Sequence, residues 1–479
     1  MNDVALLLPE IVLAGAIALV LLSDVVLPPR LRGHAAWIGV LACAVGLAFS
    51  LGAPRGAIES MLLIDGTTLL ARPAICITTL LVLVAGSARR RGEEDEGAWT
   101  IMLLGLGLGA CLCAASANLV MLWLGLETMS LCSYALAAWR VRELRPAEAG
   151  MKFVLFGGVA TGLTLFGMSH VYGTTGHLDF AGIGIALGNG MPITAIASLC
   201  LAGVGIAYKL SLVPFHFYAP DVYQGAPALS VAAVSVAPKI AALAVLVRLL
   251  QSAVPPGLVP LPTLQTALVV AASLSLLSSA FLALAQRDAK RILAFSSIGH
   301  AGAALLAVVR VRADGASVSF AAYYLAAYGV ANLGALISLA VLERDRGTTA
   351  LDRIAGAVRT HPVVTAALCT FLLSLAGLPP LAGFLGKWGV LMDCLRQGDG
   401  GRAPLFGAIA LLCSTAVSAW AYLVVIRSVL LAEPPATLRN ASERAPRSMC
   451  LVIATCLLGT LALGLWLDGF VAMSRTAVG

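Results

Sequence analysis

Charged residues are scarce in this chain, and long hydrophilic stretches are missing. Of the 479 residues, 11% are charged and 60% are hydrophobic. The mean hydropathy of +0.95 lies far above the value for a soluble domain. No polar stretch is long enough to fold as a separate soluble domain. This composition argues against an ordinary soluble protein and indicates one that lies within a membrane.

Sequence motifs of several catalytic and binding classes are missing as well. The eleven cysteines include no C-x-x-C pair, which argues against iron–sulfur or haem attachment, and we expect them to pack as small hydrophobic residues. No dinucleotide-binding glycine motif, P-loop or metal-ligand cluster is present. The net charge of +7 comes from arginines scattered over separate loops, with no basic stripe of the kind that binds nucleic acid.

Long apolar segments fill most of the chain. About fourteen segments are close to the ~20 residues that a helix needs to cross the hydrocarbon core. The sequence therefore predicts an all-α polytopic membrane protein with a single transmembrane domain over residues 1–479. We expect its parts to be three N-terminal helices, a first five-helix repeat, a second repeat of inverted orientation and a last helix, over residues 1–98, 99–252, 262–431 and 448–468.

The distribution of positive charge predicts an orientation. Most of the lysines and arginines outside the apolar segments fall in the loops that follow odd-numbered segments. Loops rich in Lys and Arg stay on the cytoplasmic side of a membrane. Both termini are therefore expected on the outer side of the membrane.

A few ionisable residues interrupt the apolar segments. One acid and three lysines, Glu127, Lys209, Lys239 and Lys387, lie within or directly beside such segments. A charge at the centre of a bilayer costs at least ~2.5–3.5 kcal/mol, so these positions are candidates for an ion or proton pathway. A structural ion pair is the alternative for Glu127 and Lys209. Lys387 could instead neutralise a helix C-terminus.

Two prolines mark breaks in the helical pattern, each close to one of these lysines. Pro214 follows Lys209 in the seventh segment, and Pro380 precedes Lys387 in the twelfth. Proline removes a helical hydrogen bond, and backbone freed in this way at membrane depth must lie against protein or a water-filled cavity. The two breaks are five segments apart. Such spacing is typical of inverted repeats whose broken helices line a transport site.

Several strings then carry a resemblance to a known family. PEIVLAGAIALVLLSD, LVMLWLGLETMSLCSYAL, PFHFYAPDVYQGAP, LAQRDAKRILAFSSIGHAG and LAGLPPLAGFLGKW resemble subunit N of bacterial respiratory complex I, the NADH-quinone oxidoreductase. This family consists of antiporter-like membrane subunits, and the resemblance extends over roughly the first thirteen segments. The PDVYQGAP string favours subunit N over its two sister subunits.

The resemblance implies roles for the buried charges. Glu127 matches the family's glutamate of helix five, and Lys209 the lysine of broken helix seven that pairs with it. Lys239 matches the central lysine of helix eight, and Lys387 the lysine of broken helix twelve near the exit. The family implies no cofactor on this chain: NADH, flavin, iron–sulfur clusters and quinone are expected on other subunits or sites of the complex. The implied partners are the other membrane-arm subunits, including the sister subunits, and the lipid bilayer.

The resulting hypothesis is a proton-translocating subunit that acts as part of a translocase and performs no redox chemistry of its own. Protons are expected to enter from the cytoplasm towards Lys209 or Lys239 and to leave by Lys387. Burial disfavours the charged form of a lysine and a nearby carboxylate favours it, so Glu127 and Lys209 together could gate this passage. The alternatives are a subunit of a related monovalent cation/proton antiporter and a non-conducting scaffold subunit.

Weaker expectations concern other ionisable groups. His216 and His300 are secondary relay candidates, because histidine titrates near neutrality, although either could be a neutral packing residue. Asp65 and Arg72 are expected at the outer membrane interface, and Glu10 in packing against another subunit. Lys152 is expected to extend towards the membrane surface beside Glu148.

Overall fold

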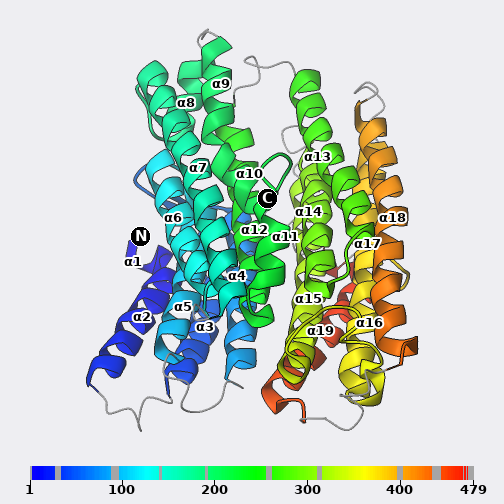
Figure 1. Cartoon of the computed structure of the whole chain (residues 1–479). Helices are drawn as coiled ribbons and strands as arrows, with labels where there is room; N and C mark the ends of the chain where they lie inside the picture. Colours follow the sequence, from blue (N-terminus) through cyan, green and yellow to red (C-terminus); the bar gives the residue numbers. More distant parts are fainter. Residues whose placement is uncertain are drawn as a thin grey trace.

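Long helices running side by side form the molecule (Figure 1). Among the described residues, ten helices are long and apolar enough to cross a membrane. Shorter apolar helices are α3 (Ala35–Leu51), α16 (Pro362–Ala376) and residues 196–210. The predicted class, an all-α polytopic membrane protein, is confirmed, while the number of fourteen crossings stays a prediction. The computed structural model describes residues 3–26, 34–87, 96–139, 143–188, 193–254, 261–309, 316–395, 403–433, 444–467, 469–470 and 472.

The N-terminal part contains three long helices and one small departure from the all-helical prediction. Two short strands pair antiparallel between α3 and α4, with Gly56 opposite Ile64. Asp65 begins α4 by accepting a hydrogen bond from the Thr68 backbone N–H, the usual way to satisfy a helix N-terminus. The elements are α1 (Asp3–Leu6), α2 (Leu8–Val26), α3 (Ala35–Leu51), β1 (Gly56–Ile58), β2 (Leu62–Ile64) and α4 (Gly66–Gly86).

The next part contains the first predicted break. The seventh apolar segment, residues 193–213, forms two helices, α9 and α10. A further short helix, α11, follows Pro214. An additional short helix, α8, was not anticipated by the sequence analysis. The elements are α5 (Glu96–Ala115), α6 (Leu119–Ala137), α7 (Leu144–Thr175), α8 (Phe180–Gly188), α9 (Ile193–Ala202), α10 (Val204–Leu210), α11 (Tyr218–Gly225) and α12 (Ala228–Ser252).

The last part contains the second predicted break, between α16 and α17. The final helix, α19, packs against α15, α4 and α17, so the end of the chain returns to helices from both earlier parts. The elements are α13 (Leu261–Leu284), α14 (Ala289–Ala307), α15 (Ala316–Arg346), the 3₁₀ turn η2 (Ala357–Arg359), α16 (Pro362–Ala376), α17 (Ala382–Leu395), α18 (Ala403–Leu431) and α19 (Arg447–Leu465).

Local features recur in the two halves that follow α4. An isolated antiparallel bridge joins Asn118 to Asp179, and another joins Asp288 to Ala350. Asn118 and Asp288 both cap the helix that follows them, α6 and α14, through a side-chain oxygen. The helices before the two bridge partners, α7 and α15, both end at a glycine in the left-handed region. The halves therefore share a local pattern at corresponding points of the chain.

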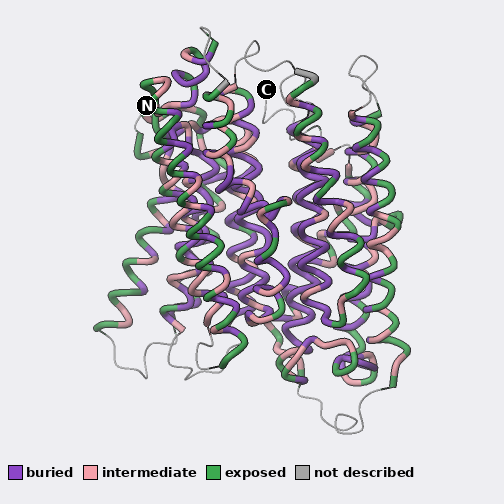
Figure 2. Tube along the Cα trace, turned by 45° about the horizontal axis from the view of Figure 1, so that its top comes forward, coloured by how far each residue is buried: buried purple, intermediate pink, exposed green. Residues whose placement is uncertain are grey.

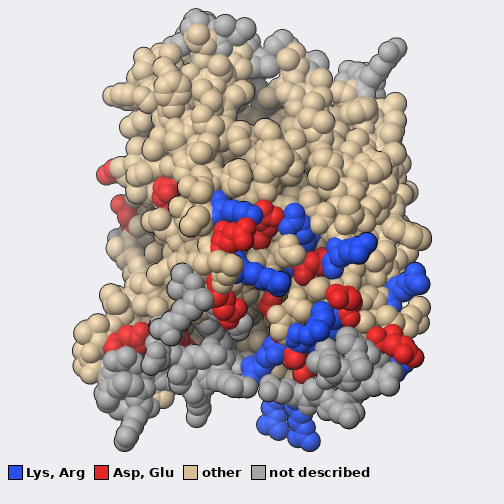
Figure 3. Space-filling view, viewed as in Figure 1, with Lys and Arg blue, Asp and Glu red and all other residues tan. Residues whose placement is uncertain are grey.

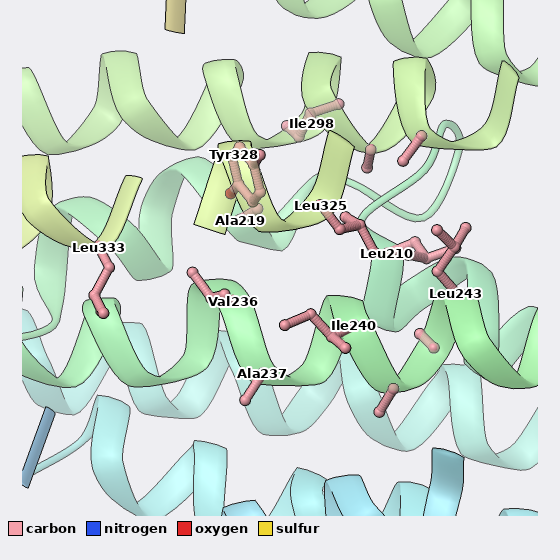
Figure 4. Close-up of a cluster of buried hydrophobic side chains, with 14 of the residues drawn as sticks. Leu210, Ala219, Val236, Ala237, Ile240, Leu243, Ile298, Leu325, Tyr328 and Leu333 are labelled. Atoms are coloured by element: carbon pink, nitrogen blue, oxygen red, sulfur yellow. The ribbon is translucent and has the colours of Figure 1, made fainter. Parts of the chain in front are cut away.

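The centre of the bundle is the most buried part (Figure 2). Helices α12 and α15 are buried over almost their whole apolar length, whereas α2, α18 and α19 are largely exposed. Side chains of α12, among them Val236 and Ile240, point into an apolar cluster that also contains Leu325 and Tyr328 of α15 (Figure 4). Apolar side chains cover the outer helices, such as Leu131 and Val159 at 65% exposure each. A bilayer solvates these outer side chains as well as a protein core would.

Charged side chains gather towards one end of the bundle. On the face shown in Figure 3, the lysines and arginines occupy the middle and lower regions, and the upper region shows none. Arginines of the loops on both predicted sides fall in residues 27–33, 88–95, 140–142, 310–315 and 396–402, outside the described residues. The predicted orientation therefore stays a prediction.

Candidate functional site

Both helix breaks expose backbone carbonyl groups at the end of a buried helix. The α10 helix ends at Ser211, whose φ of 58° is left-handed, and α16 ends at Gly377, with a φ of 89°. At Gly377 the N–H groups of residues 377 and 378 return to the carbonyls of Ser374 and Leu373, a common way to end a helix. Both breaks contain a cis proline bond, at Pro214 and Pro380. The last carbonyls of such helices carry partial negative charge and attract cations.

Lys239 and Lys387 bind these helix ends. The Lys239 Nζ donates to the Leu210 carbonyl over 2.7 Å, at the end of α10. The Lys387 Nζ donates to the carbonyls of Leu375 and Ala376 over 2.9 and 3.3 Å, at the end of α16. Lys387 therefore makes the contact with a helix C-terminus that was named as its alternative role. Lys239 makes an equivalent contact. Each lysine reaches its helix end from a different helix, α12 or α17.

Lys209 differs from the other two lysines. It is 6% exposed, and its Nζ has no hydrogen-bond partner among the described residues. The rings of Tyr134 and Tyr208 lie 5.8 and 5.9 Å from the Nζ, which is within the range of cation–π attraction. Leu210, the residue directly after Lys209, is the one whose carbonyl binds Lys239. The two lysines are thus linked through the end of α10.

Glu127 and Lys209 share a cavity without touching. Both line a cavity of about 10 Å³, close to the smallest space that holds a water molecule. Glu127 accepts a hydrogen bond of 2.6 Å from the hydroxyl of Thr161. No ion pair joins it to Lys209 among the described residues. Glu127 and Lys209 therefore line the same cavity, and the direct pair implied by the resemblance is not formed among the described residues.

A series of hydroxyl and imidazole groups occupies the space between the two breaks. The Tyr223 hydroxyl donates to Ser297 over 3.0 Å, and the Ser297 and Tyr328 hydroxyls are 2.8 Å apart. The His300 ring lies against Tyr328, and its Nδ1 is 2.6 Å from the Tyr324 hydroxyl. These side chains come from α11, α14 and α15. They connect the neighbourhood of the first break to that of the second.

His300 and Lys387 meet at a second cavity. Together with Tyr324 they line a space of about 20 Å³, enough for about one water molecule. The structure thus brings His300 and Lys387 together as the hypothesis requires. His216 is also buried, but its ring lies against Phe217 and its Nδ1 has no hydrogen-bond partner among the described residues. Among the described residues, no side-chain hydrogen bond or ion pair joins His216 to the other candidates.

The tyrosines and serines of this series were missed by the sequence analysis. Tyrosine and serine are common in membrane helices, so their presence alone carries little information. Their spacing offered a signal: Tyr324 and Tyr328 are four residues apart, Ser297 and His300 are three apart, and residues three or four apart share one face of a helix. When two adjacent helices each carry such a polar face, a polar contact between the two faces can be predicted.

The charged residues near the N-terminus have partners within this chain, and the expectation that Glu10 packs against another subunit was wrong. Arg72 is fully buried within the chain, and its Nε lies 2.8 Å from the carboxylate of Glu10. Glu10 is therefore paired within this chain and is 4% exposed, so it does not serve contact with another subunit. Asp65 binds Arg248 of α12 over 2.7 Å. Helices distant in the chain supply the partners, so a linear pattern of residues does not indicate these pairs.

A charged cluster missed by the sequence analysis connects the two halves at their surface. Lys152 pairs with Glu148, as expected, but also with Asp221 of α11 over 2.9 Å. Arg291 of α14 binds the other oxygen of Asp221 over 2.6 Å. In the same region the Lys290 ammonium binds Glu343 of α15. Because Asp221 belongs to the helix directly after the first break, these pairs tie that break to α7 and α14.

Comparisons with known proteins agree with the geometry. A family model described as NADH:quinone oxidoreductase/Mrp antiporter, TM, matches residues 116–416. The chain is 34% identical over 433 residues to NADH-quinone oxidoreductase subunit N of Rhodospirillum rubrum, covering 88% of this chain and 86% of the relative. It is 35% identical over 495 residues to subunit N of Geobacillus kaustophilus, covering 98% and 97%. A chain of respiratory complex I from Thermus thermophilus with bound aureothin superposes with a TM-score of 0.77 at 31% identity, covering 96% of this chain and 98% of that chain.

Proposed function

The chain belongs to the NADH-quinone oxidoreductase subunit N family, and we propose that its buried lysines carry protons across the membrane. The observation that supports this proposal best is the polar series between the breaks, which ends at His300, Tyr324 and Lys387 around one cavity. Hydroxyl and imidazole groups both donate and accept hydrogen bonds, so they can pass a proton along. Apolar packing alone would not require such a series at the centre of the bundle.

The proposed route has three stages. A proton from the cytoplasm reaches Lys209 or Lys239 at the first break. It then passes laterally through the hydroxyls of Ser297 and Tyr328 to His300, and leaves by Lys387. The helix-end carbonyls that bind Lys239 and Lys387 stabilise the charged state of each lysine. For a lysine to release its proton, its hydrogen bond to the helix-end carbonyl has to lengthen, or a water molecule has to accept the proton.

Glu127 is proposed to gate the first stage. In the structure it binds Thr161, and the Lys209 ammonium has no hydrogen-bond or ion-pair partner in the described part of the chain. Movement of the carboxylate towards Lys209 would favour the charged lysine, and return to Thr161 would favour the neutral one. Two such arrangements form a switch that an event elsewhere in the complex can bias. Moving a proton against 100 mV costs ~2.3 kcal/mol, within the range of such a local change.

The proposal includes a setting for the chain. It sits in the bacterial inner membrane beside sister antiporter-like subunits of the membrane arm, with both termini on the outer side. It acts as part of a translocase without redox chemistry of its own, and flavin, iron–sulfur clusters and the NADH and quinone sites belong elsewhere in the complex. Residues 99–252 and 262–431 form two inverted repeats. The matching bridges and capped helices at Asn118 and Asp288 support this division.

Replacement of Lys209 by alanine tests the proposal. We expect proton uptake by inverted membrane vesicles, measured per NADH oxidised, to fall several-fold while the complex still assembles on a native gel. The reason is that alanine removes the group that Glu127 is proposed to gate. Wild-type coupling in Lys209→Ala would favour the scaffold alternative. Uptake that depends on sodium or potassium would favour the cation antiporter alternative.

Replacement of Tyr324 by phenylalanine tests the lateral series with a smaller change. Phenylalanine keeps the ring and removes the hydroxyl that lies 2.6 Å from His300. A hydrogen bond of this kind contributes ~0.5–1.5 kcal/mol, so we expect the NADH-driven proton uptake rate to fall by roughly 2- to 10-fold. Tyr323→Phe is a matched control, because the Tyr323 hydroxyl donates to Leu463 of α19, away from the series. Equal rates in both variants would remove Tyr324 from the route.

A further inference from the structure

A large apolar cavity lies apart from the cavities at the two breaks. Its volume is about 570 Å³, and α4, α12 and α15 form most of its wall. Small side chains create much of the space, notably Ala71 and Ala74 of α4 and Ala322 and Ala326 of α15. An apolar cavity of about 150 Å³ already stays dry and accepts small hydrocarbons. A cavity this large needs an occupant, since an empty one would deprive its lining atoms of their packing contacts.

The cavity is open towards the outer surface of the helix bundle. Two of its lining residues, Leu51 and Ile77, are also 73% and 41% exposed. They belong to the end of α3 and the middle of α4, both of which face outward at these positions. An occupant can therefore enter sideways from the surrounding bilayer. The local concentration of hydrocarbon chains there exceeds that of any dissolved ligand.

The lining offers almost nothing to a polar ligand. Among the described lining residues, Ser50 and Thr67 alone have polar side chains, and the Ser50 hydroxyl donates within its own helix to the Gly46 carbonyl over 2.7 Å. Specific small-molecule sites usually contain several convergent polar groups. A quinone ring or another polar head group would lie unpaired in this space. The chemistry of the wall therefore selects a hydrocarbon chain.

We propose that this cavity holds an acyl chain of a membrane phospholipid, whose head group stays at the mouth beside α3 and α4. The chain fills the space between the N-terminal helices and the two central helices α12 and α15. It also covers the side of α12 next to Lys239, because Ile240 is part of the cavity wall. A bound lipid therefore keeps water from reaching this side of α12 from the membrane face. The proposal stands independently of the proton route.

Photolabelling of the intact complex tests the proposal. The probe is phosphatidylethanolamine with a diazirine in one acyl chain, present as a minor component of nanodiscs made of phosphatidylethanolamine and phosphatidylglycerol. Illumination should label α4 around Ala71 and Ala74 and α15 around Ala322 and Ala326. Label confined to outward-facing residues of the outer helices would overturn the proposal. Stronger labelling of the same positions by a diazirine-bearing prenylquinone would assign the cavity to quinone instead.

A paired set of variants sharpens the test. Ala322→Trp combined with Ala326→Leu fills the cavity from α15, and we expect labelling of α4 inside the cavity to fall at least several-fold. Val159→Trp is the control, because Val159 is exposed on α7 and lies outside the cavity lining. Equal labelling in the filled variant and the control would contradict the proposal. If the filled variant does not assemble, the positions labelled in the unaltered complex still decide the question.

Discussion

Replacement of Lys239 by methionine is expected to abolish most NADH-driven proton uptake while leaving the complex assembled. Lys239 is 3% exposed in α12, and its only described hydrogen bond is to the Leu210 carbonyl. Methionine fills nearly the same space without a charge, and a buried charge replaced by a well-packed apolar group often costs no stability. The lost hydrogen bond costs ~0.5–1.5 kcal/mol, too little to unfold the chain.

Arginine at the same position separates a relay role from a structural one. Lys239→Arg keeps a positive charge near the Leu210 carbonyl but cannot release its proton at physiological pH. If Lys239 passes protons, Lys239→Arg should be as defective as Lys239→Met. If its role is only to neutralise the end of α10, Lys239→Arg should pump normally. The measurement is proton uptake per NADH in inverted vesicles, with complex content checked on a native gel.

Lys152→Met provides the matched control for Lys239→Met. Its side chain is 37% exposed and lies in ion pairs with Glu148 and Asp221 at the surface. Exposed ion pairs contribute ~0–1 kcal/mol, so we expect assembly and pumping close to those of the unaltered complex. A defect in Lys152→Met as large as in Lys239→Met would show that loss of any lysine from this bundle impairs pumping. Such a result would contradict the proposal that Lys239 has a specific role in proton transfer.

Replacement of Arg72 by methionine is expected to have the largest effect on stability. Arg72 is the described ion-pair partner of Glu10, and neither carboxylate oxygen of Glu10 accepts a hydrogen bond among the described residues. Removal of Arg72 therefore leaves a buried carboxylate without compensation. Breaking a buried ion pair from one side costs ~3–5 kcal/mol, a large part of the stability of a typical domain. We expect little assembled complex, and rapid loss on heating of what does assemble.

A double replacement should reverse much of this loss. In Glu10→Gln combined with Arg72→Met, no buried charge remains, so we expect the amount of assembled complex after heating to recover most of the way. The readout is the fraction of this subunit that stays in the native-gel band as temperature rises. Recovery in the double variant is the decisive result. If both variants are equally unstable, the Arg72 contact with the Leu6 carbonyl or its packing matters more than the ion pair.

Some features could be predicted from the sequence because they depend on local chemistry. Apolar segments of sufficient length must be helical in a bilayer, where backbone groups find no water. Prolines at 214 and 380 mark places where helices have to end. Lys209, Lys239 and Lys387 were recognisable as candidates because a charge inside an apolar segment is costly. These predictions required no knowledge of which helices are neighbours.

The partners of other residues could not be predicted, for a reason that applies to any helical bundle. Arg72 and Asp65 are seven residues apart in the chain. In the structure Arg72 binds α2 and Asp65 binds α12, so each is paired with a partner far away in the sequence. Hydropathy indicates that a segment lies in the membrane. It does not indicate which face of one helix meets which face of another.

The sequence by itself determined the class of protein, the family, the two helix breaks and the three buried lysines, because each follows from composition, motif or the energy of a charge in hydrocarbon. Only the tertiary structure decided what each lysine contacts. Lys239 and Lys387 bind helix ends formed by other segments, and Lys209 faces a cavity shared with Glu127. The series through His300 and the apolar cavity also exist only in the folded chain. The physical reason is that packing brings together surfaces separated by many residues, and a linear pattern contains no record of those contacts.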